Sequence, residues 1–136
     1  MKILSCESYR NPAEHSPEVV EIATEVLRNG GIVAHPTDTC YGLAVDVMNE
    51  SAIKKLYDAK GMAMDKPVSI LVDSLEEAQK YGEFSDLALR LADEFWPGPL
   101  TLVVPRKESL PSFFNPGSKT VGIRVINEPI LVAVLG

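Results

Sequence analysis

Apolar and polar residues follow two patterns along the chain, and each pattern predicts a type of element. After Ser16, a candidate N-cap, apolar residues recur at helical spacing from Pro17 to the stop signal Asn29-Gly30-Gly31. We therefore expect a helix there. The apolar run Ile32–Ala34 predicts a strand that ends at Pro36, because proline cannot donate a hydrogen bond to a neighbouring strand.

Later segments continue the alternation of helix and strand. N-capping residues followed by periodic apolar positions predict helices, and short apolar runs between turns predict strands. The helices follow Asn49, Ser74, Ser85 and Asn127, and the strands cover Met1–Cys6, Leu43–Val47, Val68–Val72, Leu100–Val104 and Thr120–Ile126. The helix after Ser85 is expected to turn Leu87, Ala88, Leu91, Ala92 and Phe95 inward. This order predicts an α/β (α+β) fold with a mixed sheet.

Composition narrows the class of protein. The 136 residues suit one domain, and the net charge of −6 disfavours broad binding to nucleic acid, because an acidic surface repels a polyanion. Cys6 and Cys40 form no metal-ligand cluster, and two lone cysteines favour a reducing compartment over a disulfide framework. No apolar run approaches the length of a membrane span. We therefore expect a cytoplasmic protein without a membrane partner.

A polar step interrupts the chain directly after the strand that ends at Pro36. Thr37 and Thr39 are two residues apart, so an extended backbone would point both hydroxyls the same way. Two hydroxyls at a strand end can hold a small polar ligand, since each offers one donor and two acceptor sites. Alternatively, this segment is a turn in which the threonines cap backbone groups. His35, beside the proline, is expected to be a packed histidine and not a catalytic base.

Four further segments follow the polar step in a specific order. The sequence continues with Ala59-Lys60-Gly61, Asp65-Lys66-Pro67-Val68-Ser69-Ile70, Phe95-Trp96-Pro97-Gly98-Pro99-Leu100-Thr101 and Thr120-Val121-Gly122-Ile123-Arg124-Val125. Any one of these segments alone is weak evidence for a protein family. The ordered set resembles the YrdC-like domain of threonylcarbamoyl-AMP synthases, from about Gly30 to the end of the chain.

The resemblance implies a fold and a reaction. Family members have a twisted mixed sheet with flanking helices around a concave cavity. They join L-threonine, bicarbonate and ATP into threonylcarbamoyl-AMP, with release of pyrophosphate and with Mg²⁺ in the site. A partner enzyme then transfers the threonylcarbamoyl group to an adenosine of tRNA. No covalent nucleophile is implied, so the protein would contribute positioning and charge neutralisation, and we expect no catalytic residue in the strict sense.

The resemblance also assigns two residues to L-threonine. Thr37 matches the position that holds the amino acid, and Arg124 matches the arginine that takes its carboxylate. A planar guanidinium suits that bidentate contact. For Arg124 the alternative is a surface salt bridge at a strand end, because its side chain lies on the face opposite to Ile123 and Val125 and could point to solvent or into a cleft.

Two more residues match nucleotide-binding positions. Lys60 corresponds to a lysine on the ATP phosphates, where an ammonium stabilises charge on the leaving pyrophosphate. Its alternative role is to complement the dipole at a helix C-terminus. Thr120 corresponds to a position near the nucleotide, and its alternative role is that of a β-branched strand former. Ser69 shares a strand face with Leu71 and is expected to face the cavity, whereas Trp96 is expected in the core.

The chain departs from the family pattern in several places. Met62 stands where the family has an arginine, which removes a charge-assisted contact of about 1.5–3 kcal/mol. Lys66 replaces an asparagine and Leu71 replaces a histidine. The 1–136 domain also lacks the C-terminal strand with the Ser-x-Asn motif. We expect weak ATP binding for these reasons, and dimerisation that covers the sheet edge left by the absent strand.

Two alternatives remain from the sequence. Carbamoyl adenylation, as in the carbamoyltransferases of hydrogenase maturation, uses a similar domain, but the zinc-finger and acylphosphatase-like regions of those chains are absent here. A non-catalytic module that binds double-stranded RNA is the other alternative, against which the net charge of −6 and the small number of arginines argue.

Overall fold

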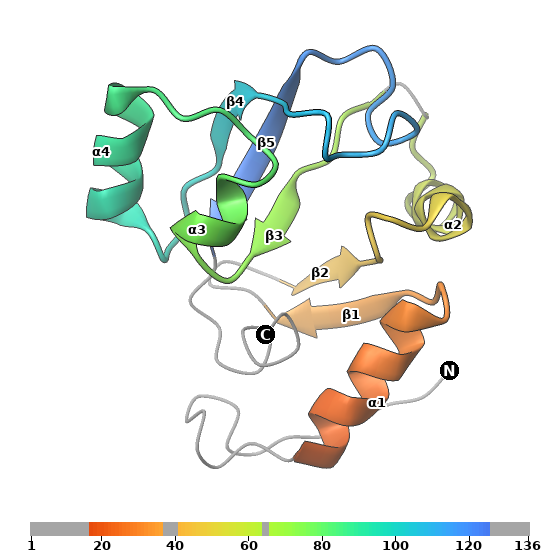
Figure 1. The fold of residues 1–136 in the computed structure, drawn as a ribbon. Helices are drawn as coiled ribbons and strands as arrows, with labels where there is room; N and C mark the ends of the chain where they lie inside the picture. The colour runs from red at the N-terminus through yellow and green to blue at the C-terminus, as the bar shows by residue number, and fades with distance from the viewer. Residues whose placement is uncertain (1–16, 37–40, 64–65, 126–136) are drawn as a thin grey trace.

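The computed structural model describes residues 17–36, 41–63 and 66–125. Helices and strands are interspersed along these residues, as Figure 1 shows. In chain order they are α1 (Pro17–Arg28), β1 (Val33–Pro36), β2 (Tyr41–Ala44), α2 (Glu50–Lys60), β3 (Ile70–Val72), α3 (Leu75–Ala78), α4 (Asp86–Phe95), β4 (Leu102–Pro105) and β5 (Thr120–Val125). The predicted α/β class is confirmed.

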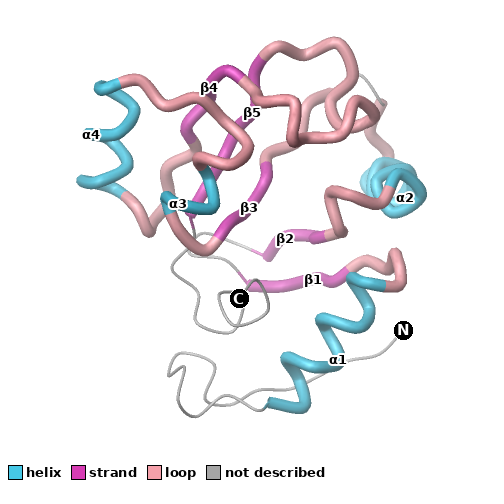
Figure 2. Tube along the Cα trace, in the orientation of Figure 1, coloured by secondary structure: helices cyan, strands magenta, loops and turns pink. Residues whose placement is uncertain are grey.

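The strands form a three-stranded sheet and a separate hairpin. The sheet has the order β3-β5-β4, with β5 parallel to β3 and antiparallel to β4, so it is mixed as predicted. The hairpin pairs β1 with β2 from Val33↔Ala44 to Pro36↔Tyr41. Figure 2 shows α1 alongside this hairpin and away from the three-stranded sheet.

Local sequence signals set the ends of three helices. The side chains of Asn49, Ser74 and Ser85 accept hydrogen bonds from the backbone N–H groups of Ala52, Glu77 and Ala88, which makes all three the N-caps that were predicted. Gly61 ends α2 with a φ of 62°, a left-handed conformation that glycine adopts without a steric penalty. Helix α3 is a single short turn that ends at Ala78.

One face of the three-stranded sheet carries the core. The inward residues of the sheet are Ile70, Val72, Leu102, Val104, Val121, Ile123 and Val125, and all are buried. Ala78 of α3 and Ala88 and Ala92 of α4 belong to the same cluster, so these helices cover this face. Ile123 and Val121, with exposed fractions of 0% and 1%, lie at the centre of this core cluster, on the middle strand β5.

The structure corrects several expectations in detail. Leu87 and Phe95 are 65% and 49% exposed, so α4 turns inward mainly its alanines and Leu91. Strand β3 begins at Ile70 because the backbone of Val68 is occupied by the side chain of Asn115. Strand β2 ends at Ala44 and not at Val47.

Other expectations hold or lie outside the described residues. His35 is 5% exposed on β1, which confirms a packed histidine. The indole of Trp96 packs against the core and donates to the Leu100 carbonyl over 2.7 Å. The predicted first strand at Met1–Cys6 and the helix after Asn127 lie outside the described ranges. Among the helices described, none is long and apolar enough to cross a membrane.

Candidate functional site

The face of the sheet opposite to the core, here called the open face, carries the polar residues of β5. Thr120, Gly122 and Arg124 alternate with the buried Val121, Ile123 and Val125, because successive side chains of a strand point to opposite faces. The side chain of Thr120 is exposed and Arg124 is half-buried. The structure therefore brings two of the predicted site residues onto one side of one strand.

Strand register defines the neighbours of Arg124 on the open face. Leu71 of β3 lies directly opposite Arg124, and Val103 of β4 lies opposite Gly122. Continuing the same registers by one residue places Ser69 beside Gly122 and Thr101 beside Arg124. The open face thus consists of Ser69, Leu71, Thr101, Val103, Thr120, Gly122 and Arg124.

Gly122 makes room on this face for its neighbours. A Cβ atom added at Gly122 would lie 2.7 Å from the Oγ of Ser69 and 3.2 Å from the Cγ2 of Thr101. The Ser69 hydroxyl therefore extends over the glycine, on the same side of the sheet as the guanidinium. Any larger residue at position 122 would displace it. Sequence reasoning missed Gly122 and Thr101 as site residues, although strand alternation and the register of neighbouring strands could have identified both.

The chemistry of the open face favours an anionic or zwitterionic ligand. It offers the guanidinium of Arg124, which only donates, and the hydroxyls of Ser69, Thr101 and Thr120, which both donate and accept. No acidic residue belongs to the described open face. Because guanidinium–carboxylate pairs are short and frequently bidentate, a carboxylate is the group that Arg124 fits best.

Lys60 lies elsewhere. It is the last residue of α2 and its side chain is exposed, directly before the left-handed Gly61. Among the described elements, α2 is not one of those that pack extensively against β5. Lys60 is therefore not a residue of the three-stranded sheet, and its place at the end of α2 also suits the alternative role at the helix C-terminus.

Thr37 and Thr39 lie outside the described residues, so their convergence with Arg124 stays a prediction. The open face is defined by residues of the three-stranded sheet and its flanks alone.

The three departures from the family pattern can be located. Met62 is half-buried and packs against the core, so its thioether contributes packing and no hydrogen-bond donor. The side chain of Lys66 is exposed, and its backbone carbonyl accepts a hydrogen bond from the Tyr57 hydroxyl. Leu71 is half-buried next to Arg124 and supplies an apolar wall.

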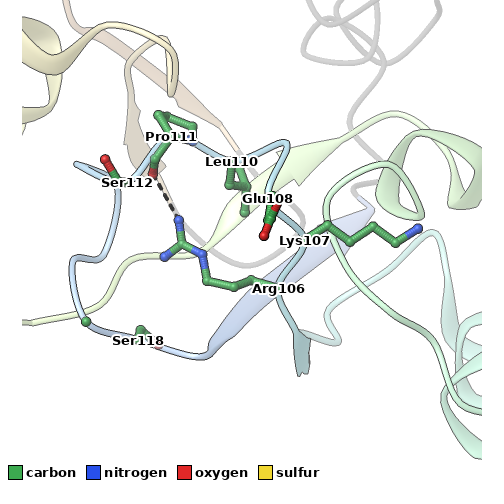
Figure 3. A pocket seen from close by; sticks show the side chains of 8 residues that line it. Arg106, Lys107, Glu108, Leu110, Pro111, Ser112 and Ser118 are labelled. Carbon is green, nitrogen blue, oxygen red and sulfur yellow. Dashed lines mark hydrogen bonds between the residues drawn. The ribbon is translucent and has the colours of Figure 1, made fainter.

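Two hollows occur in the described part of the chain, and the open face shares only Val103 with their linings. The first has a volume of about 490 Å³ and is lined by Arg106, Lys107, Glu108, Leu110, Pro111, Ser112, Gly117 and Ser118 (Figure 3). The guanidinium of Arg106 donates to the carbonyls of Pro111, Phe114 and Asn115, so it holds the loop together. Lys107 donates to the Gln79 carbonyl over 2.6 Å. The cations of this hollow therefore have structural partners.

The second hollow has a volume of about 460 Å³ and lies between α4 and β4. Its lining is mainly apolar and includes Leu87, Leu91 and Val103. Its polar side chains are Glu83 and Ser85, and the Ser85 hydroxyl already accepts a hydrogen bond as the N-cap of α4, so the hollow contains no cation for a carboxylate. Across residues 17–36, 41–63 and 66–125, no three or more His, Cys, Asp or Glu side chains gather closely enough to hold a metal ion.

Comparisons with known proteins agree with this fold and with the ordered motifs. The Sua5/YciO/YrdC family model, described as "Telomere recombination", matches residues 25–136. A protein of Methanocaldococcus jannaschii is 37% identical over 123 residues, which are 90% of this chain and 58% of that protein. The threonylcarbamoyl-AMP synthase of Pyrococcus abyssi is 40% identical over 107 residues, 78% of this chain and 32% of that protein.

A solved structure shows the same fold with a ligand. The crystal structure of P. abyssi Sua5 complexed with L-threonine has a TM-score of 0.83 and 36% identity, over 88% of this chain and 36% of that one. This chain thus spans well under two thirds of the length of each of these relatives. Since the family model covers most of the sequence, the chain belongs to the Sua5/YciO/YrdC family.

Proposed function

We propose that the chain acts in the formation of threonylcarbamoyl-AMP from L-threonine, bicarbonate and ATP, for modification of an adenosine in tRNA by a partner enzyme. The observation that carries the proposal is the half-buried Arg124 among hydroxyl groups on an open sheet face. The similarity to a threonylcarbamoyl-AMP synthase and to a Sua5 structure with L-threonine supports it.

In this proposal, Arg124 holds the α-carboxylate of L-threonine, with Thr37 as a second contact. The amine of threonine reacts with bicarbonate to give the carbamate and water, and the carbamate oxygen then attacks the α-phosphate of ATP as pyrophosphate leaves. The chain's contribution is to orient the amino acid and to neutralise its carboxylate. This requires no protein nucleophile, and the open face offers none beyond unactivated hydroxyls.

Lys60 and Thr120 are proposed to contact ATP, Lys60 at the phosphates and Thr120 through its hydroxyl. Their exposed side chains are accessible to a ligand. Met62 adds no charge to this contact because it packs against the core. We therefore expect ATP to bind more weakly than L-threonine. Mg²⁺ would accompany the ATP phosphates, and since the described residues form no metal-binding cluster, no step is assigned to it.

Titration calorimetry with L-threonine tests the proposal. Arg124→Ala is expected to weaken binding about 10- to 100-fold, because a charge-assisted contact of roughly 1.5–3 kcal/mol is lost. Thr37→Ala should weaken it less. Both variants should stay folded, which circular dichroism checks; Arg124 is not among the buried core residues. Arg90→Ala, an exposed arginine on α4, is the matched control and should bind L-threonine normally. Unchanged affinity in Arg124→Ala and Thr37→Ala would contradict the assignment.

A double-stranded RNA-binding module is the alternative proposal. Strong, salt-dependent binding to duplex RNA with no response to L-threonine would favour it. Arg106 is unsuited to that role because it donates to three backbone carbonyls. The net charge of −6 also argues against it.

A homodimer and a cytoplasmic location are also proposals. Leu87, Phe95 and Val103 are exposed around α4 and the edge strand β4, which gives an apolar surface that a second copy could cover. A monomer in sedimentation equilibrium at high concentration would contradict the dimer. The cytoplasmic location is proposed from the two lone cysteines, which favour a reducing compartment, and from the lack of an apolar run as long as a membrane span.

A further inference from the structure

Ser69 is placed for substrate contact by the strand that follows it. The residue precedes β3, and the pairing of Ile70 with Ile123 puts it beside Gly122 on the open face. Its Oγ would lie 2.7 Å from a Cβ at position 122, so the hydroxyl occupies the space above the glycine. The side chain is exposed, and no hydrogen bond of its hydroxyl is formed within the described residues. The group is therefore available to a ligand beside Arg124.

A buried asparagine fixes the backbone next to this serine. The Asn115 side-chain amide donates from Nδ2 to the Val68 carbonyl over 2.9 Å, and its Oδ1 accepts from the Val68 N–H over 3.1 Å. The Asn115 amide thus makes the two hydrogen bonds to the Val68 backbone that a residue of a neighbouring strand would make. Asn115 is 6% exposed and lies 47 positions along the chain from Val68, so the contact joins two distant segments.

Asparagine suits this position for two physical reasons. Its φ is 45°, a left-handed conformation that asparagine tolerates better than most residues. Its amide also offers both a donor and an acceptor, which the N–H and carbonyl of Val68 require. The loop is held from the other side, where Arg106 donates to the Asn115 carbonyl over 3.1 Å. Arg106 directly follows β4, so it links the Asn115 side chain, and the Val68 backbone that this side chain holds, to that strand.

We infer that Ser69 is a further contact for the amino-acid substrate and that Asn115 is the residue that positions it. The inference rests on the proposed function, because Arg124 must hold the carboxylate of the same ligand. A guanidinium can only donate, whereas a serine hydroxyl can also accept. Together they match a zwitterionic amino acid, with the carboxylate on Arg124 and a second polar group on Ser69. Asn115 acts through Val68 and does not touch the substrate.

Titration of the full 136-residue chain with L-threonine tests the inference. Ser69→Ala removes one neutral hydrogen bond, so affinity should fall about 3- to 10-fold. Asn115→Ala should lower affinity to a similar extent because Ser69 loses its fixed position. In the Ser69→Ala background, Asn115→Ala should have no further effect on affinity, which a double-mutant cycle measures. A purely structural asparagine would lower affinity equally in both backgrounds.

Controls separate this outcome from loss of stability and from failure of the proposed function. Ser85→Ala removes the N-cap of α4, which is not an open-face residue, and should leave L-threonine affinity unchanged while it lowers stability. Normal affinity in Ser69→Ala together with lost affinity in Arg124→Ala would overturn the inference and leave the proposed function standing. Absence of L-threonine binding by the unmodified chain would overturn both. If Asn115→Ala does not fold, the Ser69→Ala result alone decides the substrate contact.

Discussion

The two faces of the three-stranded sheet are built from the same strands, yet they differ in solvent exposure and in polarity. Toward α3 and α4, β5 presents Val121, Ile123 and Val125, which are at most 5% exposed. On the open face the same strand presents a threonine, a glycine and an arginine. One face therefore buries apolar area, and the other holds polar groups at the separations that the strand register fixes.

The comparison also explains why the open face can carry polar residues without loss of the fold. Backbone hydrogen bonds hold β5 between β3 and β4, and the core face supplies the apolar burial. A substitution on the open face therefore leaves both sources of stability in place. We expect mutations on the two faces to separate into effects on stability and effects on ligand affinity.

The largest expected effect comes from the core face. Ile123→Ala removes a fully buried side chain at the centre of the sheet, and the cavity should destabilise the protein by about 2–5 kcal/mol. Urea denaturation followed by circular dichroism measures this change. Val103→Ala, at a residue 67% exposed on the neighbouring strand, is the control and should change stability by less than about 0.5 kcal/mol. Equal losses in the two variants would remove the distinction between the faces.

An intermediate effect is expected at Gly122. Gly122→Ala adds a Cβ atom 2.7 Å from the Oγ of Ser69, so the serine must move. L-threonine affinity should fall about 3- to 10-fold, the loss expected for one displaced hydrogen bond. Gly117→Ala is a control for glycine replacement, because nothing lies near its added Cβ; its φ of 80° will make it the less stable variant. Higher L-threonine affinity in Gly122→Ala would contradict the role given to Ser69.

The smallest effect is expected on the surface of α3. The ammonium of Lys80 lies 2.9 Å from the carboxylate of Glu77 and lowers the pKa of that carboxyl from its ordinary value of 4.5. Because the folded-state pKa is depressed, the contribution to stability is present above pH 4.5 and is lost as the pH falls below it. Glu77→Gln should therefore be slightly less stable than the unmodified chain at pH 7, and the difference should shrink in acid.

Solvent exposure limits this last effect, since exposed ion pairs are screened by water and salt. Thermal melts of both proteins at pH 7 and at low pH measure it. Glu76→Gln, at the exposed neighbouring residue, is the charge-matched control. If the stability difference between Glu77→Gln and the unmodified chain increased as the pH fell, the predicted sign of the pH dependence would be wrong.

Local signals in the sequence predicted most of the elements. Asn49, Ser74 and Ser85 cap helices because their short polar side chains satisfy backbone N–H groups within three residues, which is a strictly local interaction. Strict alternation in β5 likewise placed Arg124 and Thr120 on the face opposite to Ile123. The ordered motifs indicated the family, which the match over residues 25–136 confirms.

The remaining features depend on contacts between distant segments. The start of β3 is set by Asn115, and nothing near Val68 in the sequence indicates that partner. The space above Gly122 depends on the register of three strands, which periodicity alone does not give. Leu87 was expected inside because it is apolar, but the small alanines of α4 allow the closest approach to the sheet, and Leu87 is left at the exposed edge.

Whether the open face binds the amino-acid substrate can be measured by NMR chemical-shift mapping with L-threonine. We predict that the backbone amide resonances of Ser69, Thr101, Gly122 and Arg124 shift in a saturable manner, while those of α4 and of the 106–118 loop do not change. Saturable shifts confined to that loop, or to the hollow between α4 and β4, would contradict the claim.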